Sequence, residues 1–161
     1  MNTSFTLNGQ LTTLTCPVDT RLADILREHL SMTATKVACS VGRCGACTVL
    51  MDGKAVNACL VMAYQLDGAE IMTVEGLEAH PLALALRAGL AEENAFQCGY
   101  CAPGFSMALA ALLTEKPDAG EDEIRAGLEG NICRCTGYHS IIRGALNAVS
   151  RIREAGLALG A

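Results

Sequence analysis

The spacing of the cysteines constrains this chain more than any other feature of its sequence. Eight of the nine cysteines fall into two groups of four, and Cys16 stands apart. The first group is Cys39, Cys44, Cys47 and Cys59, and the second group is Cys98, Cys101, Cys133 and Cys135. Cysteines make up less of the chain than the roughly 8–10% typical of a disulfide scaffold. Each set of four therefore needs an explanation other than a dense disulfide framework.

The start of the chain bears on whether the thiols form disulfides or bind metal. No Lys or Arg precedes Arg21, and residues 1–17 are rich in Thr rather than continuously apolar, so neither a signal peptide nor a transit peptide is expected. No apolar run approaches the roughly 18 residues of a membrane span. We therefore expect a cytoplasmic protein whose thiols stay reduced, which favours metal ligation. Cys16 lies in an alternating apolar segment and is expected to be a buried structural thiol.

The first group has the spacing of a plant-type 2Fe-2S site. Its first three members follow the pattern C-x4-C-x2-C, and Cys59 comes after eleven further residues. Because four thiolates must converge on two irons, we expect three from one tight loop and the fourth from a neighbouring strand. Gly42 and Gly45 stand between these cysteines, where the backbone needs positive φ and close approach. The amides freed in such a loop can donate hydrogen bonds to sulfur.

The second group combines a C-x2-C pair with a C-x-C pair, in the strings QCGYCAPG and GNICRCTGY. Pro103 follows the first pair closely, so we expect Cys98 and Cys101 at a helix N-terminus, where the helix dipole favours thiolate over thiol. Cys133 and Cys135 are two residues apart, which in an extended segment points both sulfur atoms the same way. Together these residues predict a second four-thiolate site.

Two other interpretations of the second group stay open. A C-x2-C pair also occurs in thioredoxin-like proteins, but these need a βαβ pattern, which does not surround Cys98. Four thiolates also bind structural zinc, although zinc ribbons usually pair two C-x2-C knuckles about 15–20 residues apart. Here a C-x-C pair follows 31 residues after the first pair. The spacing favours an iron-sulfur cluster and leaves zinc as its rival.

Composition argues against several other classes of function. The net charge of −5, from 12 Lys and Arg against 17 Asp and Glu, gives no electrostatic support for nucleic-acid binding. Three Tyr, three Phe and no Trp leave few rings for base stacking. Hydrophobic residues form 51% of the chain, which indicates a packed core. No Ser/His/Asp set, phosphate loop or carboxylate pair stands out, so we expect electron-transfer sites and no substrate site on this chain.

The first half predicts an α+β domain. Asn8-Gly9 and Asp52-Gly53 are hairpin signals, and each stands between alternating apolar segments. Apolar residues at helical spacing predict one helix between the two hairpins. The expected strands cover residues 3–7, 11–16, 48–51, 55–60 and 71–74, and the expected helix covers residues 20–30.

The second half predicts a four-helix bundle. Strand signals stop near Gly76, and Ala, Leu and Arg become common after it. We therefore divide the chain into domains of residues 1–76 and 77–161. Pro81 and Pro103 each suit the start of a helix. The expected helices cover residues 81–91, 105–114, 118–128 and 141–152.

In three ordered strings, TKVACSVGRCGACTV, QCGYCAPG and GNICRCTGY, the chain resembles the small iron-sulfur subunits of the molybdenum hydroxylases, also called the xanthine oxidase family. The resemblance covers nearly the whole chain. It implies an N-terminal β-grasp, plant-type ferredoxin-like domain and an all-α four-helix-bundle domain, each holding one 2Fe-2S cluster on its four cysteines.

The resemblance also implies partners. In such enzymes a large subunit carries a molybdopterin cofactor, often the cytosine dinucleotide form, and a medium subunit carries FAD. The assembly can be a dimer of heterotrimers. Electrons pass from molybdenum to the helical-domain cluster, then to the ferredoxin-type cluster, and on to FAD. The analogy places Gln97, which precedes Cys98, near the pterin. The competing hypotheses are a free-standing two-cluster electron carrier and a zinc-stabilised interaction module.

Overall fold

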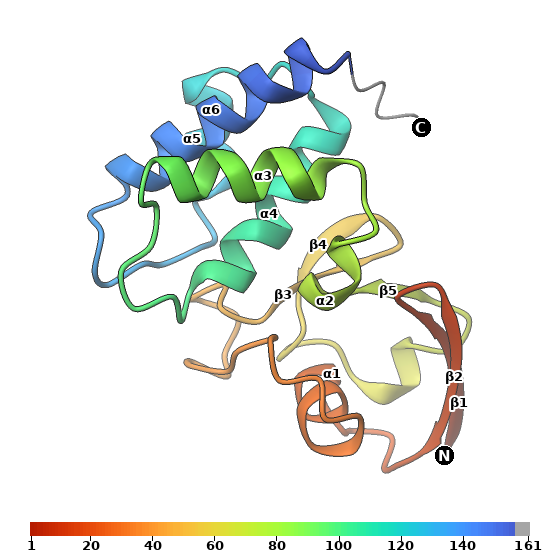
Figure 1. The fold of residues 1–161 in the computed structure, drawn as a ribbon. Helices are drawn as coiled ribbons and strands as arrows, with labels where there is room; N and C mark the ends of the chain where they lie inside the picture. Colours follow the sequence, from red (N-terminus) through yellow and green to blue (C-terminus); the bar gives the residue numbers. More distant parts are fainter. Residues whose placement is uncertain (157–161) are drawn as a thin grey trace.

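The computed structural model describes residues 1–156, in which a sheet is followed by a set of helices (Figure 1). The predicted order of an α+β part and a helical part is confirmed. The last five residues of the expected helical domain, 157–161, lie outside the described residues. Over the described residues, no helix has both the length and the apolar character needed to cross a membrane.

The N-terminal part is built on a mixed five-stranded sheet with the order β2-β1-β5-β3-β4. Its strands are β1 (Asn2–Leu7), β2 (Gln10–Thr15), β3 (Thr48–Met51), β4 (Lys54–Asn57) and β5 (Glu70–Met72). β1 pairs with β5 in parallel, whereas the other neighbouring strands are antiparallel. Both predicted hairpins are present, and their turn residues have positive φ, which Asn-Gly and Asp-Gly turns tolerate well.

The helix predicted over residues 20–30 forms in two unlike pieces. α1 (Leu22–Asp24) continues directly into η1 (Ile25–His29), a π-helical turn in which the amide of Leu30 donates to the carbonyl of Ile25 at 3.0 Å. Leu22, Ile25 and Leu26 are fully buried in the core of the sheet domain. The apolar spacing therefore located the buried face correctly, but it cannot distinguish this wider turn from an α-helix.

The second part contains the four predicted helices and one short extra helix. They are α2 (Val74–Leu77), α3 (Leu82–Glu92), α4 (Ala102–Glu115), α5 (Glu121–Gly127) and α6 (His139–Glu154). A 3-10 turn, η2 (Ala63–Gln65), belongs to the first part. α2 was not predicted, because its four residues are too few to show a period. α3 and α6 lie side by side in Figure 1 and approach closely at Gly89 and Gly144.

The two parts meet where α4 crosses the sheet edge formed by β3 and β4. Each part has its own hydrophobic core, one centred on residues such as Phe5 and Ile71 and the other on residues such as Phe105 and Leu109. Leu50 of β3 belongs to the helical core, so burial is continuous across the contact. This contact holds the cysteine loops of the two parts against each other.

The α3–α6 contact yields a stability prediction. A Cβ atom at Gly89 would lie 2.5 Å from the carbonyl oxygen of Gly144 and 2.6 Å from the amide nitrogen of Ala148, and both atoms are backbone. We expect Gly89→Ala to lower the free energy of unfolding by about 1–3 kcal/mol, because the helices must separate. Leu84→Ala on the same helix is the control: Leu84 is 78% exposed, so its effect should stay within about 0.5 kcal/mol. Urea denaturation measures both, and equal midpoints would contradict the prediction.

Candidate metal centres

The first cysteine group lies on the loop between η1 and β3 and on the turn after β4. Cys39, Cys44 and Cys47 come from the loop, whereas Cys59 follows β4. The amide of Ala58 donates to the carbonyl of Cys47 at 3.2 Å, which ties the turn to the loop. The spacing correctly predicted three cysteines from one loop, but the strand expected over residues 55–60 ends at Asn57, so Cys59 lies in a turn rather than on a strand.

The second group lies where the bundle faces that loop. Cys98 and Cys101 immediately precede α4, and the other two members lie in the irregular segment between α5 and α6. The sulfur atoms of Cys98 and Cys135 are 3.6 Å apart. Both of these cysteines are exposed, whereas Cys133 is buried. One edge of the second group is therefore open to a partner, and the other faces the protein interior.

Within each group the thiols lie close enough to change one another's pKa. All nine cysteines are free thiols. Among residues 1–156, no three Cys, His, Asp or Glu side chains close around one point as a single metal ion would require. A 2Fe-2S cluster instead takes two protein ligands on each of two irons. Within the first group the thiols of Cys59 and Cys44 both raise the pKa of Cys47, and within the second group those of Cys133 and Cys98 both raise the pKa of Cys101.

Hydrogen bonds and burial give two cysteines of the first group very different pKa values. The backbone amides of Val41 and Arg43 donate to Cys39 Sγ at 3.5 and 3.3 Å, and these bonds lower the pKa of Cys39 to about 6. Burial raises the pKa of Cys47 to about 12; the backbone amide of Cys59 opposes this increase, whereas the Cys59 thiol adds to it. A metal cation would compensate the negative charge that this buried pair disfavours.

The second group carries its own hydrogen bonds to sulfur. Burial opposes ionisation of Cys133, but the Thr136 hydroxyl, together with the amides of Cys135 and Thr136, lowers its pKa overall. The Thr136 hydroxyl donates to Cys133 Sγ at 3.2 Å and accepts the amide of Tyr138, also at 3.2 Å, which orients its proton toward sulfur. Sequence analysis missed Thr136 and Tyr138 because a hydroxyl near a cysteine is not a signal until the loop conformation is known.

One electrostatic expectation is wrong for Cys101. It stands at the N-cap of α4, as predicted, but burial raises its pKa to about 12, and its neighbour Cys133 adds to the increase. The thiol is therefore favoured here despite the helix dipole. Desolvation of this half-buried thiolate outweighs the dipole, which contributes at most about 2 kcal/mol.

The backbone of the first loop fits an inorganic cluster. Gly42 and Gly45 have φ values of 73° and 67°, as their positions between ligands predicted. A Cβ atom at Gly45 would lie 2.4 Å from the carbonyl oxygen of Gly130, and one at Gly42 would lie 2.3 Å from Leu60 Cδ1. The loop can therefore curl around a cluster with its amides directed at sulfur only because these positions carry no side chain.

The remaining predicted residues occupy distinct surroundings. Gln97 is exposed and stands directly before the exposed Cys98. Cys16 is 4% exposed in the core of the sheet domain, which confirms its prediction as a buried thiol.

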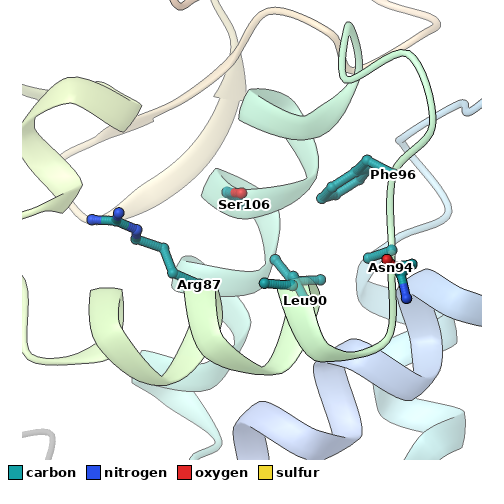
Figure 2. Close-up of a pocket in the computed structure, with 7 residues that line it drawn as sticks. Arg87, Leu90, Asn94, Phe96 and Ser106 are labelled. Atoms are coloured by element: carbon teal, nitrogen blue, oxygen red, sulfur yellow. The ribbon is translucent and has the colours of Figure 1, made fainter.

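A cavity of about 430 Å³ lies between α3, the loop after it and α4 (Figure 2). Arg87, Leu90, Asn94, Phe96 and Ser106 are among its lining residues. A row of three aromatic rings connects this cavity with the second cysteine group. The ring of Phe96 packs on Phe105 with centroids 6.1 Å apart, and Phe105 packs on Tyr138 with centroids 6.3 Å apart. These rings therefore pack between the two segments that carry the second cysteine group.

Two family models match the chain in the order of its two parts. A 2Fe-2S iron-sulfur cluster binding domain matches residues 5–76, and a second 2Fe-2S binding domain matches residues 73–146. The fold and the thiol groups therefore define a protein with two 2Fe-2S binding domains.

Whole-chain relatives narrow this class. The chain is 51% identical over 140 residues to a probable xanthine dehydrogenase subunit of Bacillus subtilis, covering 87% of this chain and 80% of that one. It is 41% identical over 145 residues to the nicotinate dehydrogenase small FeS subunit of Eubacterium barkeri, covering 90% and 92%. The structure of quinoline 2-oxidoreductase from Pseudomonas putida 86 superposes with a TM-score of 0.89 at 39% identity, covering 97% of both chains. The chain belongs to the family of small iron-sulfur, electron-transfer subunits of the molybdenum hydroxylases.

The unlike pKa values in the first group predict unequal thiol reactivity. In the full chain freed of metal by chelation, we expect iodoacetamide to label Cys39 at pH 7 much faster than Cys47, because the pKa of Cys39 is about 6 and that of Cys47 about 12. Below pH 6 the labelling rate of Cys39 should fall by about tenfold per pH unit as thiolate is lost. Peptide mass spectrometry measures both rates, with the urea-unfolded chain as the control in which they converge. Equal rates in the folded chain would contradict the assignment.

Proposed function

We propose that the eight thiols of the two groups are the ligands of two 2Fe-2S clusters, and that the chain relays single electrons between redox cofactors on two other subunits. Each cluster would take Cys39, Cys44, Cys47 and Cys59, or Cys98, Cys101, Cys133 and Cys135. One observation carries the proposal: a backbone hydrogen bond connects the two cysteine groups. The amide of Ile132, which precedes Cys133, donates to the carbonyl of Cys44 at 2.9 Å. Two cofactors bound there would stand in series.

The exposed edge of the second group indicates where electrons would enter the chain. Cys98 and Cys135 are exposed, and Gln97 precedes Cys98 at the same surface. We propose that a large subunit carrying molybdopterin, in its cytosine dinucleotide form, docks here and that Gln97 contacts the pterin. Tyr100 and Ile132, which are 48% and 51% exposed, supply apolar surface beside this edge.

Exposed apolar side chains beside the first group indicate where electrons would leave the chain. Val41 and Leu60 are 61% and 54% exposed and flank its loop, and Leu60 packs closely against the loop at Gly42. We propose that a medium subunit carrying FAD covers this surface, within a dimer of heterotrimers. Such apolar side chains at a redox centre fit burial by a partner better than contact with water.

The division of the chain is also proposed, as residues 1–76 and 77–161. The two separate hydrophobic cores support it, although α2 (Val74–Leu77) runs across the division. We propose a cytoplasmic location because free thiols suit a reducing compartment.

Metal analysis of anaerobically purified full chain tests the ligand assignment. We expect two clusters of two irons each, hence four irons and four acid-labile sulfides per chain, together with two distinguishable EPR signals after reduction. Zinc in place of one cluster would show that the second group is structural and would end the relay proposal.

Co-purification tests the partners. When the chain is tagged in its native host, we expect molybdenum and flavin to be recovered with it. Four irons without molybdenum or flavin, under conditions that preserve complexes, would favour the free-standing two-cluster carrier.

The Thr136 hydroxyl predicts a shift in one reduction potential. Thr136→Val removes the donor to Cys133 Sγ while keeping the side-chain shape. Reduction adds negative charge to the sulfurs, so loss of the donor should lower one potential by a few tens of millivolts. A hydrogen bond contributes about 0.5–1.5 kcal/mol, and 59 mV corresponds to about 1.4 kcal/mol for one electron.

An EPR-monitored redox titration of both signals measures this shift. Thr114→Val is the matched control, because the Thr114 hydroxyl donates within α4 to the carbonyl of Ala110 at 2.7 Å. Unchanged potentials in Thr136→Val would refute the role of this hydroxyl.

A further inference from the structure

The two cysteine groups are connected through one short stretch of backbone. The amide of Ile132 donates to the carbonyl of Cys44 at 2.9 Å. Ile132 directly precedes Cys133, and Cys44 is itself a proposed ligand. A single hydrogen bond and the backbone of Ile132 therefore separate a ligand of one group from a ligand of the other.

Asn131 ties the same two segments together with its side chain. It is 6% exposed, and its Nδ2 donates to the carbonyl of Gly45 at 3.1 Å and to Thr48 Oγ1 at 3.4 Å. The Thr48 hydroxyl in turn donates to the same Gly45 carbonyl at 2.7 Å. A buried amide held by two acceptors in the first loop has little freedom to move.

The packing around Gly45 leaves little slack. A Cβ atom at Gly104, in the first turn of α4 after Cys101, would lie 2.1 Å from the carbonyl oxygen of Gly45. A Cβ atom at Gly45 itself would meet the carbonyl of Gly130 and the amide group of Asn131. Both cysteine segments of the helical part thus press on the loop that carries the first group.

We propose that Asn131 is a positioning residue that sets the separation of the two clusters. This inference rests on the proposed function. One electron leaves the cluster of the helical part, which is oxidised by one electron, and reaches the cluster of the sheet part, which is reduced by one; no bond forms or breaks. Because the rate of electron tunnelling falls steeply with distance, a rigid spacing between the groups sets the rate of this step.

The test is Asn131→Leu in the full chain with both clusters loaded. Leucine is close to asparagine in shape but cannot donate, and the Gly45 carbonyl keeps its bond from Thr48. When both clusters are reduced, their unpaired spins split each other's EPR signals at low temperature, and this splitting falls with the cube of the distance. We expect a smaller or lost splitting with the iron and sulfide content unchanged.

Asn57→Leu is the matched control. Asn57 stands two residues before Cys59, as Asn131 stands two residues before Cys133. Its Nδ2 also donates to a carbonyl of the first loop, that of Gly42, at 3.1 Å, but this bond stays within the sheet part. Asn57→Leu should therefore leave the splitting unchanged, even where it alters a potential. The same splitting in Asn131→Leu as in the unsubstituted chain would overturn the proposal.

A second variant, Thr48→Val, keeps the proposal testable if Asn131→Leu loses a cluster. Thr48→Val removes one of the two acceptors of Asn131 and keeps the side-chain shape, so it should reduce the splitting less than Asn131→Leu does. Loss of a cluster from both variants would also overturn the proposal, because the contact would then hold the ligands rather than set their spacing. Failure of the proposed function is separate: it would show as zinc or fewer than four irons in the unsubstituted chain.

Discussion

The structure depends on the convergence of four thiols at two neighbouring places. Thiols that are buried together resist ionisation, as the raised pKa values of Cys47 and Cys101 show. The chain opposes this cost locally, through amides directed at Cys39 and a hydroxyl directed at Cys133. The proposed iron ligation would remove the rest of the cost, because the thiolate is the form that binds metal. Metal uptake should therefore add to the stability of the folded chain.

That convergence also determines how the two parts are joined. A loop that curls around a cluster exposes its carbonyls on the outer side, and buried carbonyls need donors. The helical part supplies donors to two of these carbonyls: the amide of Ile132 donates to Cys44, and the side chain of Asn131 donates to Gly45, which also accepts from Thr48. The backs of the two cysteine segments thus add to the contact that α4 makes with β3 and β4.

Local signals account for what the sequence could predict. Asn-Gly and Asp-Gly turns located both hairpins, prolines and apolar spacing located four helices, and cysteine spacing grouped the eight thiols. The short helix α2 was not predicted because four residues are too few to show a period, and the π-helical turn at Ile25–His29 because its apolar spacing fits an α-helix equally well. The sheet order was not predicted because it depends on contacts between distant residues. Asn131 escaped for the same reason, since its acceptors are 86 and 83 residues away in the chain. The raised pKa of Cys101 shows that burial, which spacing does not reveal, can exceed a helix dipole.

The relatives also suggest why such a chain tells so little about a substrate. Proteins with names as different as xanthine dehydrogenase and nicotinate dehydrogenase subunits are 51% and 41% identical to it. An electron carries no record of the bond from which it was removed. A relay is therefore constrained by spacing, potential and the surfaces of its neighbours, and the side chains that meet these constraints here surround the sulfur atoms. Selection for a new substrate can act on another subunit while the contact between Cys44 and Ile132 stays as it is.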